Sequence, residues 1–214
     1  MNFKVFKWVW ALFLVSLAGT LVIFPKLPPT IPIHWNIYGV ADNYAPKPFV
    51  FFTAFLPVLF YLLFFLIPRI DPKRESYQKH HKAYEVLTNI IIILMIAIHW
   101  LSMVASLGVK ININMILSVG VGILFVIIGN YMSQIRHNYF FGIRTPWTLA
   151  NETVWTKTHR MGGFAFVIGG IIFAAGGLIN SHYGVWIGII YLFASTIYLF
   201  AYSYLVFRQL KGER

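Results

Sequence analysis

The chain has 214 residues, of which 59% are hydrophobic and 11% are charged. An ordinary soluble domain carries about 25% charged residues, so this composition excludes a large soluble domain and predicts that lipid surrounds most of the chain. The formal net charge of +11 would suit a nucleic-acid binder, but the basic residues follow the connections between apolar runs, so no direct contact with nucleic acid is expected. Cysteine is absent, which excludes disulfides, thiolate metal sites and a cysteine nucleophile.

Six uninterrupted apolar runs approach or exceed the length that crosses the hydrocarbon of a bilayer, about 20 residues per helix. In lipid each run must be helical, because only a helix satisfies its own backbone there. The sequence therefore predicts an all-α integral membrane protein, a six-helix transmembrane bundle forming a single membrane domain over residues 1–214. The expected spans are 8–24, 49–67, 86–107, 113–132, 164–179 and 185–207.

The distribution of positive charge predicts the orientation of this bundle, because short cytoplasmic loops accumulate Lys and Arg. Of the 17 lysines and arginines, only Lys26, Lys47 and Lys110 fall in the first, third and fifth connections. All the others lie in the N-terminal segment, the second and fourth connections and the C-terminal tail. We therefore expect both termini to be cytoplasmic.

The first connection, residues 25–48, is the predicted outer loop and contains six of the ten prolines. These prolines impose extended, stiff backbone. The polar groups between them suit a ligand, a partner peptide or a cation, although one histidine and one carboxylate are too few for a metal site without other ligands. The alternative is that Trp35 and Tyr38 lie at the bilayer interface while the polar groups brace a turn. The candidate ligand-facing residues are His34, Trp35, Asn36, Gly39, Asp42 and Lys47.

One ionisable side chain, His99, lies near the middle of the third span. An intramembrane ionisable residue is a functional candidate, although a neutral histidine bonded to a neighbouring helix is the commoner case. No Asp, Glu, Lys or Arg lies within any span core, which argues against a proton relay or an ion-coupled transporter.

Glycine pairs recur every seven residues through the fifth span, and single glycines repeat that spacing in the fourth span. Small residues in register let helices approach closely in lipid, so the pattern predicts a packing seam rather than a ligand groove. The pairs are Gly162–Gly163, Gly169–Gly170 and Gly176–Gly177, and the single glycines are Gly122 and Gly129.

The fourth connection, residues 133–163, is the predicted inner loop and is long enough to suggest a function or structure of its own. Thr145 followed by Pro146 suits a helix N-cap and first turn, and Asn151 suits a second helix start. On that second helix Glu152, Trp155 and His159 share one face.

Two roles for this segment follow from its composition. It suits a helix on the membrane surface, with Trp147 and Trp155 dipping into the bilayer and Lys157 and Arg160 facing headgroups. It also suits a docking surface for a cytoplasmic protein. An acid and base pair of Glu152 with His159 lacks a nucleophile, a metal-ligand set and a phosphate-binding loop, so catalysis is not favoured and no cofactor or metal is expected.

Both loops resemble known families. Residues 27–36, LPPTIPIHWN, with Gly39 and Asp42, resemble the N-terminal signature of bacterial membrane proteins of unassigned chemistry. Residues 142–149, GIRTPWTL, continuing through Glu152 and Trp155 to Arg160, are similar to the signature of the SdpI immunity proteins of Gram-positive bacteria. The resemblance covers essentially the whole chain, in the same order.

This resemblance implies a multi-pass protein of the bacterial cytoplasmic membrane that protects its cell from a secreted, membrane-active toxin peptide. It also implies a second role, as a toxin sensor that holds an ArsR-type repressor at the membrane. The outer loop would then meet the toxin and the inner loop would carry the signal. A transporter or export component and a membrane-embedded enzyme remain the alternatives. The candidate signalling residues are Arg144, Thr145, Pro146, Trp147, Thr148, Glu152, Trp155, Lys157, His159 and Arg160.

Overall fold

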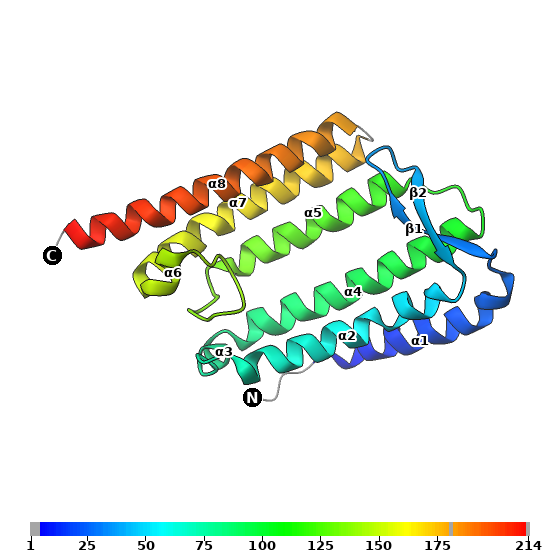
Figure 1. The fold of residues 1–214 in the computed structure, drawn as a ribbon, viewed down its shortest axis with the longest axis horizontal. Helices are drawn as coiled ribbons and strands as arrows, with labels where there is room; N and C mark the ends of the chain where they lie inside the picture. The colour runs from blue at the N-terminus through cyan, green and yellow to red at the C-terminus, as the bar shows by residue number, and fades with distance from the viewer. Residues whose placement is uncertain (1–4, 180–181, 213–214) are drawn as a thin grey trace.

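The computed structural model describes residues 5–179 and 182–212, and this part of the chain contains six helices long and apolar enough to cross a membrane. They confirm the predicted six-helix transmembrane bundle. Successive spans run in opposite directions (Figure 1). The spanning helices are α1 (Lys7–Ile23), α2 (Phe49–Ile70), α4 (His81–Ser106), α5 (Ile113–Met132), α7 (Glu152–Leu178) and α8 (His182–Gly212).

The shorter elements lie at the two ends of the bundle. A 3-10 turn η1 (Phe24–Lys26) and the strands β1 (Thr30–Trp35) and β2 (Ala41–Pro46) form one end, which we call the hairpin end. The short helices α3 (Ser76–Lys79) and α6 (Pro146–Ala150) lie at the other end, where α1 begins and α8 ends (Figure 1). We call this the termini end; that it faces the cytoplasm remains a prediction.

The six spans group into two halves of three helices. Helices α1, α2 and α4 pack together through apolar side chains such as Val9, Phe13 and Ile96. Helices α5, α7 and α8 form the second half, in which α7 packs closely against both neighbours. Between the halves, α4 packs against α5, less extensively than α7 packs against its neighbours but no less than α1 packs against α2 or α4 (Figure 1). The second half is therefore the more tightly packed of the two, and α4 connects it to the first half through α5.

Glycines bring α5 and α7 into backbone contact, as predicted. A Cβ added at Gly122 would lie 2.6 Å from the carbonyl oxygen of Gly170, and one at Gly129 would lie 2.6 Å from that of Gly163. The other glycine of each pair faces α8; a Cβ at Gly176 would lie 2.5 Å from the backbone of Gly184. The glycine pairs thus form two adjacent stripes, one for each neighbour of α7, because consecutive residues on a helix point about 100° apart.

His99 joins all three helices of the first half. It is 2% exposed; its Nε2 lies 2.8 Å from Oγ1 of Thr20 on α1, and its Nδ1 lies 2.8 Å from Oγ1 of Thr53 on α2. The next residue, Trp100, donates its indole N–H to Ser16 Oγ at 2.7 Å. Both ring nitrogens of the buried histidine are thus bonded to neighbouring helices.

The expected surface helix after Asn151 is not a separate element, which corrects that interpretation. Asn151 caps a helix as predicted, but this helix is α7, and it continues through residue 163 to the hairpin end without a break. Trp155 is 1% exposed and packs inside the protein instead of dipping into lipid. The reason is that the polar residues from Glu152 to Arg160 and the apolar run after them form one helix, and Gly162 and Gly163 lie within it as packing positions.

We expect Gly122→Ala to lower the stability of the protein by about 1–3 kcal/mol, because the new methyl group overlaps the α7 backbone. Gly120→Ala is the matched control on the same helix, since its Cβ would lie 3.7 Å from Leu94 Cδ1, an ordinary contact. Thermal melting in detergent measures both changes. Equal melting temperatures for the two variants would contradict the close contact between α5 and α7.

Candidate functional site

The outer loop folds as an antiparallel β-hairpin in which Thr30 pairs with Pro46 and Trp35 pairs with Ala41. Asn36 closes the turn, because its Oδ1 accepts the backbone N–H groups of Tyr38 at 2.9 Å and Val40 at 3.1 Å. Gly39 supplies the positive φ of 74° that the turn requires. Extended, stiff backbone was predictable from the prolines; the strand pairing was not part of that prediction.

The base of the hairpin is fixed to the first half. Ile31 is fully buried, and Ser102 Oγ of α4 donates to the carbonyl of Pro32 at 2.5 Å. Lys47 donates from Nζ to the carbonyls of Pro25 and Leu27, at 3.3 and 3.2 Å. Its ammonium group is therefore engaged in bracing the start of the loop.

The tip of the hairpin, together with the exposed side of β2 next to it, presents a polar pair and exposed aromatic rings. His34 Nδ1 lies 2.5 Å from Asp42 Oδ1, and the two side chains are 64% and 42% exposed. Tyr38 and Tyr44 are 67% and 56% exposed. Among the six candidate residues of this loop, His34 and Asp42 are the pair that is open to a ligand, while Asn36, Gly39 and Lys47 shape the loop and Trp35 is half-buried.

The hairpin also reaches the second half. The ring of Tyr38 lies 5.5 Å from that of His182, at the start of α8. Gly39 lies against α5, where an added Cβ would be 3.4 Å from Asn114 Cβ. With its base on α4, the hairpin contacts both halves of the bundle.

At the termini end, the segment between α5 and α6 is shaped by a buried asparagine. Asn138 is fully buried; its Oδ1 accepts the N–H groups of Phe140 and Phe141, at 3.0 and 2.7 Å. Its Nδ2 donates to the carbonyls of Arg136 and Phe141, at 2.8 and 2.9 Å. One side chain thereby holds the whole turn in place.

Asp71, the C-cap of α2, fastens this turn to the first half. One carboxylate oxygen accepts the Tyr77 hydroxyl at 2.9 Å and the Tyr139 N–H at 3.0 Å. Burial, together with this hydrogen bond to a carboxylate, raises the pKa of Tyr77 well above its usual range. The N–H of Arg136 donates to His80 Nδ1 at 3.2 Å, and burial followed by the charge of Arg136 lowers the pKa of His80 to about 4.

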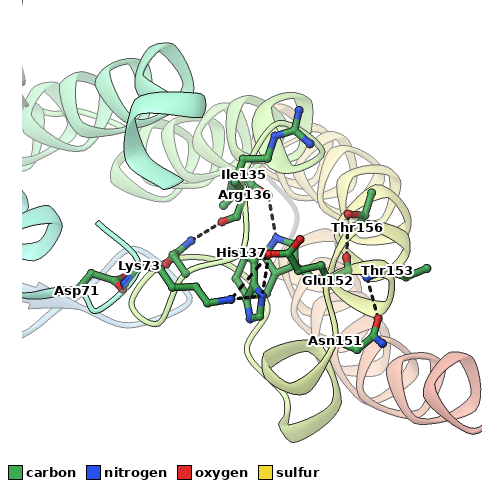
Figure 2. A network of polar contacts seen from close by, with 11 residues as sticks. Asp71, Lys73, Ile135, Arg136, His137, Asn151, Glu152, Thr153 and Thr156 are labelled. Atoms are coloured by element: carbon green, nitrogen blue, oxygen red, sulfur yellow. Dashed lines mark hydrogen bonds and ion pairs between the residues drawn. The ribbon is translucent and has the colours of Figure 1, made fainter. Parts of the chain in front are cut away.

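A polar hollow of about 380 Å³ lies where this turn meets α3 and α7. Lys73 donates to His137 Nδ1 at 2.8 Å, and Glu152 Oε1 lies 3.7 Å from that nitrogen and 3.8 Å from Lys73 Nζ (Figure 2). Because Lys73 donates, Nδ1 of His137 is an acceptor. Burial and then Lys73 lower the pKa of His137, against the opposing effect of Glu152. The hollow is lined by His137 and Glu152 together with Ser76, Lys79, Arg136, Trp155 and Thr156.

Trp155 and His159 support the turn from the second half. Their rings stack with centroids 4.0 Å apart, and the Trp155 indole donates to the carbonyl of Ile135 at 2.8 Å. His159 donates from Nδ1 to the carbonyl of Trp155 at 2.9 Å and accepts the N–H of Ile143 at Nε2 at 3.0 Å. Both nitrogens of His159 are thus bonded to backbone. Glu152 does not pair with His159, because its carboxylate faces His137 and Lys73.

The capping residues of α6 are also structural. Thr145 and Thr148 form a reciprocal capping box, with Pro146 in the first turn. Thr145 Oγ1 lies 3.0 Å from Ser203 Oγ of α8, which ties α6 to the last span. Trp147 packs on that span at Phe200 and Tyr204.

The remaining candidates of the inner loop have three different environments. Arg144 donates to the carbonyl of Tyr139 at 2.8 Å and so supports the turn. Lys157 and Arg160 are exposed on another face of α7, away from the hollow. In the described ranges no three His, Asp or Glu residues gather where a metal ion could be held.

Five buried or half-buried residues that make the polar contacts at the termini end were not among the candidates from the sequence. The usable signal was local: Asp71 directly follows a span, and His137 and Asn138 precede the GIRTPWTL stretch. Their contacts join segments far apart in the chain, which spacing does not reveal. They are Asp71, Lys73, His80, His137 and Asn138.

Both loops lie within regions matched by known families. Residues 134–205 match the SdpI/YfhL protein family, and residues 11–60 match a domain of unknown function (DUF1648). The Immunity protein SdpI of Bacillus subtilis (strain 168) is 30% identical over 154 residues, which cover 72% of each chain. The chain belongs to the SdpI/YfhL family. No solved structure matches it.

The resemblance noted in the two loops is confirmed by these matches. The SdpI/YfhL match includes the buried Asn138, the capping box and the first turns of α7, and the other match includes the whole hairpin. Together with six apolar spans, membership in this family makes the chain a multi-pass protein of the cell membrane.

We expect the termini end of this SdpI/YfhL protein to lose stability as the pH falls from 6.5 toward 4. The unfolded chain binds a proton at the ordinary His80 pKa of 6.5, whereas in the fold this pKa is about 4, so the stabilising contribution is complete above 6.5 and is lost between the two values. Thermal melting across this pH window measures the loss.

The variant His80→Asn tests the assignment, because an amide oxygen can still accept the Arg136 N–H but does not titrate. Its melting temperature should depend less on pH than that of the wild type. Parallel pH profiles for the two proteins would show that His80 is not the responsible group.

Proposed function

We propose that this protein protects its cell against a secreted, membrane-active peptide, as an immunity protein of the SdpI type. The observation that carries the proposal is the 30% identity to the Immunity protein SdpI over 72% of each chain. An alignment of this extent includes most of the bundle, and so supports a shared role more strongly than a single shared motif would.

The hairpin tip is the surface that we assign to the toxin peptide. Charge placement predicts that it faces outward, where a secreted peptide arrives. Its exposed Tyr38 and Tyr44 rings suit the apolar face of an amphipathic peptide, and the pair of His34 and Asp42 suits polar groups on the other face. The partner of this surface is therefore a peptide that also contacts the bilayer.

A sensing role is the finer part of the proposal. The hairpin contacts both halves at one end, and the turn around Asn138 contacts both halves at the other. A peptide that changes how the halves meet at the hairpin would therefore disturb the turn. We assign the basic rim of the polar hollow, Lys79 and Arg136, to docking of an ArsR-type repressor on the predicted cytoplasmic side.

Replacing both His34 and Asp42 by alanine should lower the protection of a sensitive strain that expresses this protein, by tenfold or more in survival under toxin. The reason is that these side chains are the exposed polar pair of the tip. Lys110→Ala, an exposed change in another connection at the same end, is the matched control and should protect fully. Survival counts at equal membrane abundance are the measurement.

Failure of the wild type to protect, with the protein present in the membrane, would overturn the immunity proposal. Two rival classes have their own signatures. Movement of a solute or peptide across reconstituted vesicles would indicate a transporter, and turnover lost in Glu152→Gln without loss of protein would indicate an enzyme.

Reversing the charge of Lys79 and Arg136 to glutamate should abolish recruitment of the repressor to membranes and leave protection unchanged, because both residues lie at the termini end. Arg208→Glu with Lys211→Glu makes the same charge change on α8 and is the control. Fluorescence imaging of a labelled repressor gives the readout. Normal recruitment by the Lys79 and Arg136 variant would rule out docking on this rim.

A further inference from the structure

A stripe of exposed residues runs along α7 between α5 and α8. It begins with Lys157 and Arg160 and continues with Phe164 and Ile168 toward the hairpin end. These residues follow the spacing of one helix face. The face is therefore cationic near the termini end and apolar within the span, and neither polar surface described above includes it.

Hollows flank Phe164 on both sides of this stripe. Between α5 and α7 lies one of about 390 Å³, with the apolar wall of Gly129, Gly163 and Val167. Between α7 and α8 lie two adjoining hollows of about 360 and 380 Å³, which share Met161 and Phe164. Two grooves thus extend from the termini end toward the middle of the bundle, one on each side of a single phenylalanine.

Arg160 lines the α5/α7 hollow and also the α7/α8 hollow nearer the termini end, so one cation stands at the mouth of both grooves. It lies eight residues, about 12 Å, beyond the start of α7. Because α7 has 27 residues, or about 40 Å, against about 30 Å of hydrocarbon, this depth is close to where headgroups begin. A long arginine side chain can extend to that level while its stem contacts acyl chains.

No acidic side chain lines any of the three hollows among the described residues. Lys157 and Arg160 form no ion pair within residues 5–179 and 182–212, in contrast to Lys73, which lies beside Glu152. Donors that suit a phosphate surround the mouths, namely Asn130, Ser133, Tyr202 and Gln209. This face of α7 therefore combines unpaired positive charge and polar donors near the termini end with two apolar grooves that extend into the span.

We propose that this face of α7 is a binding site for an anionic diacyl phospholipid. The phosphate lies at Lys157 and Arg160, one acyl chain occupies the α5/α7 groove, and the other occupies the α7/α8 groove. A lipid with a net negative charge is favoured over a zwitterionic one, because each nearby Lys or Arg attracts its headgroup charge. A symmetric contact with a second copy of this chain would instead bring like charges together, since the same patch would face itself.

The test uses the purified full chain in detergent, titrated with dioleoyl phosphatidylglycerol or dioleoyl phosphatidylcholine, with bound lipid counted by native mass spectrometry. The wild type should bind phosphatidylglycerol more tightly. Arg160→Gln with Lys157→Gln should weaken that binding roughly tenfold or more, from the loss of two charges. Arg208→Gln with Lys211→Gln, which removes the same charge from α8 outside the grooves, should leave it unchanged.

A second pair of variants tests the shape of the site independently of its charge. Ala194 is exposed and lines the α7/α8 groove, so Ala194→Phe should fill the groove and weaken phosphatidylglycerol binding several-fold. Thr196→Phe places the same ring on the opposite face of α8 and should have no such effect. If the charge variant fails to fold, as judged by its melting temperature, the comparison of Ala194→Phe with Thr196→Phe tests the proposal without it.

Three results would each overturn the proposal: equal binding of the two lipids by the wild type, unchanged binding in the Ala194 variant, or an equal loss in the α8 charge control. A dimer whose formation depends on Arg160 and excludes lipid would also overturn it, in favour of a contact between copies. None of these measurements uses a toxin, so their failure does not bear on the proposed immunity function.

Discussion

The architecture depends on how helices are held together where the solvent is itself apolar. Burying a leucine between two spans brings little gain in lipid, so close backbone contact and hydrogen bonds must hold the helices. The two halves use different means. In the second half, Gly122 and Gly129 let α5 touch the backbone of α7. In the first half, where such glycine contacts are less prominent, His99 and Trp100 bond α4 to its neighbours. Each half is thus held together by its own kind of contact, and α4 and α5 connect the two halves within the membrane.

The polar ends of the molecule connect the two halves again, outside the contact between α4 and α5. At one end the hairpin contacts α4, α5 and α8. At the other end the turn around Asn138 is fastened to Asp71 and His80 on one side and to Trp155 and His159 on the other. Both segments therefore bridge the halves outside the hydrocarbon, where hydrogen bonds fix their shape. A relative movement of the halves would change the contacts of the hairpin and of the turn around Asn138 at the same time. The proposed sensing role requires this property.

Local signals in the sequence were sufficient for the spans and for the helix starts at Thr145 and Asn151, because hydropathy and capping depend on neighbouring residues. The continuity of α7 was missed because the predicted span followed the apolar run from Phe164, whereas the helix begins in the polar stretch before it. The polar cluster at the termini end was missed for another reason. Asp71 and Tyr139 are 68 residues apart, and His80 and Arg136 are 56 apart. Residue types suggested Glu152 and His159 as partners, whereas the fold gives each of them different contacts.

The bonds around His99 also bear on the order in which the first half is assembled. Thr20 and Thr53 each have a carbonyl of their own helix within reach, Ser16 at 2.8 Å and Val50 at 2.9 Å. Both hydroxyls are therefore satisfied before any other helix arrives, and α1 and α2 can enter the bilayer independently. The imidazole of His99 has no comparable backbone partner among its described bonds, so α4 carries an unmet polar group until both threonines are in place. Docking of α4 against α1 and α2 is thus favoured over leaving α4 alone in lipid, because only the docked imidazole gains both hydroxyl partners.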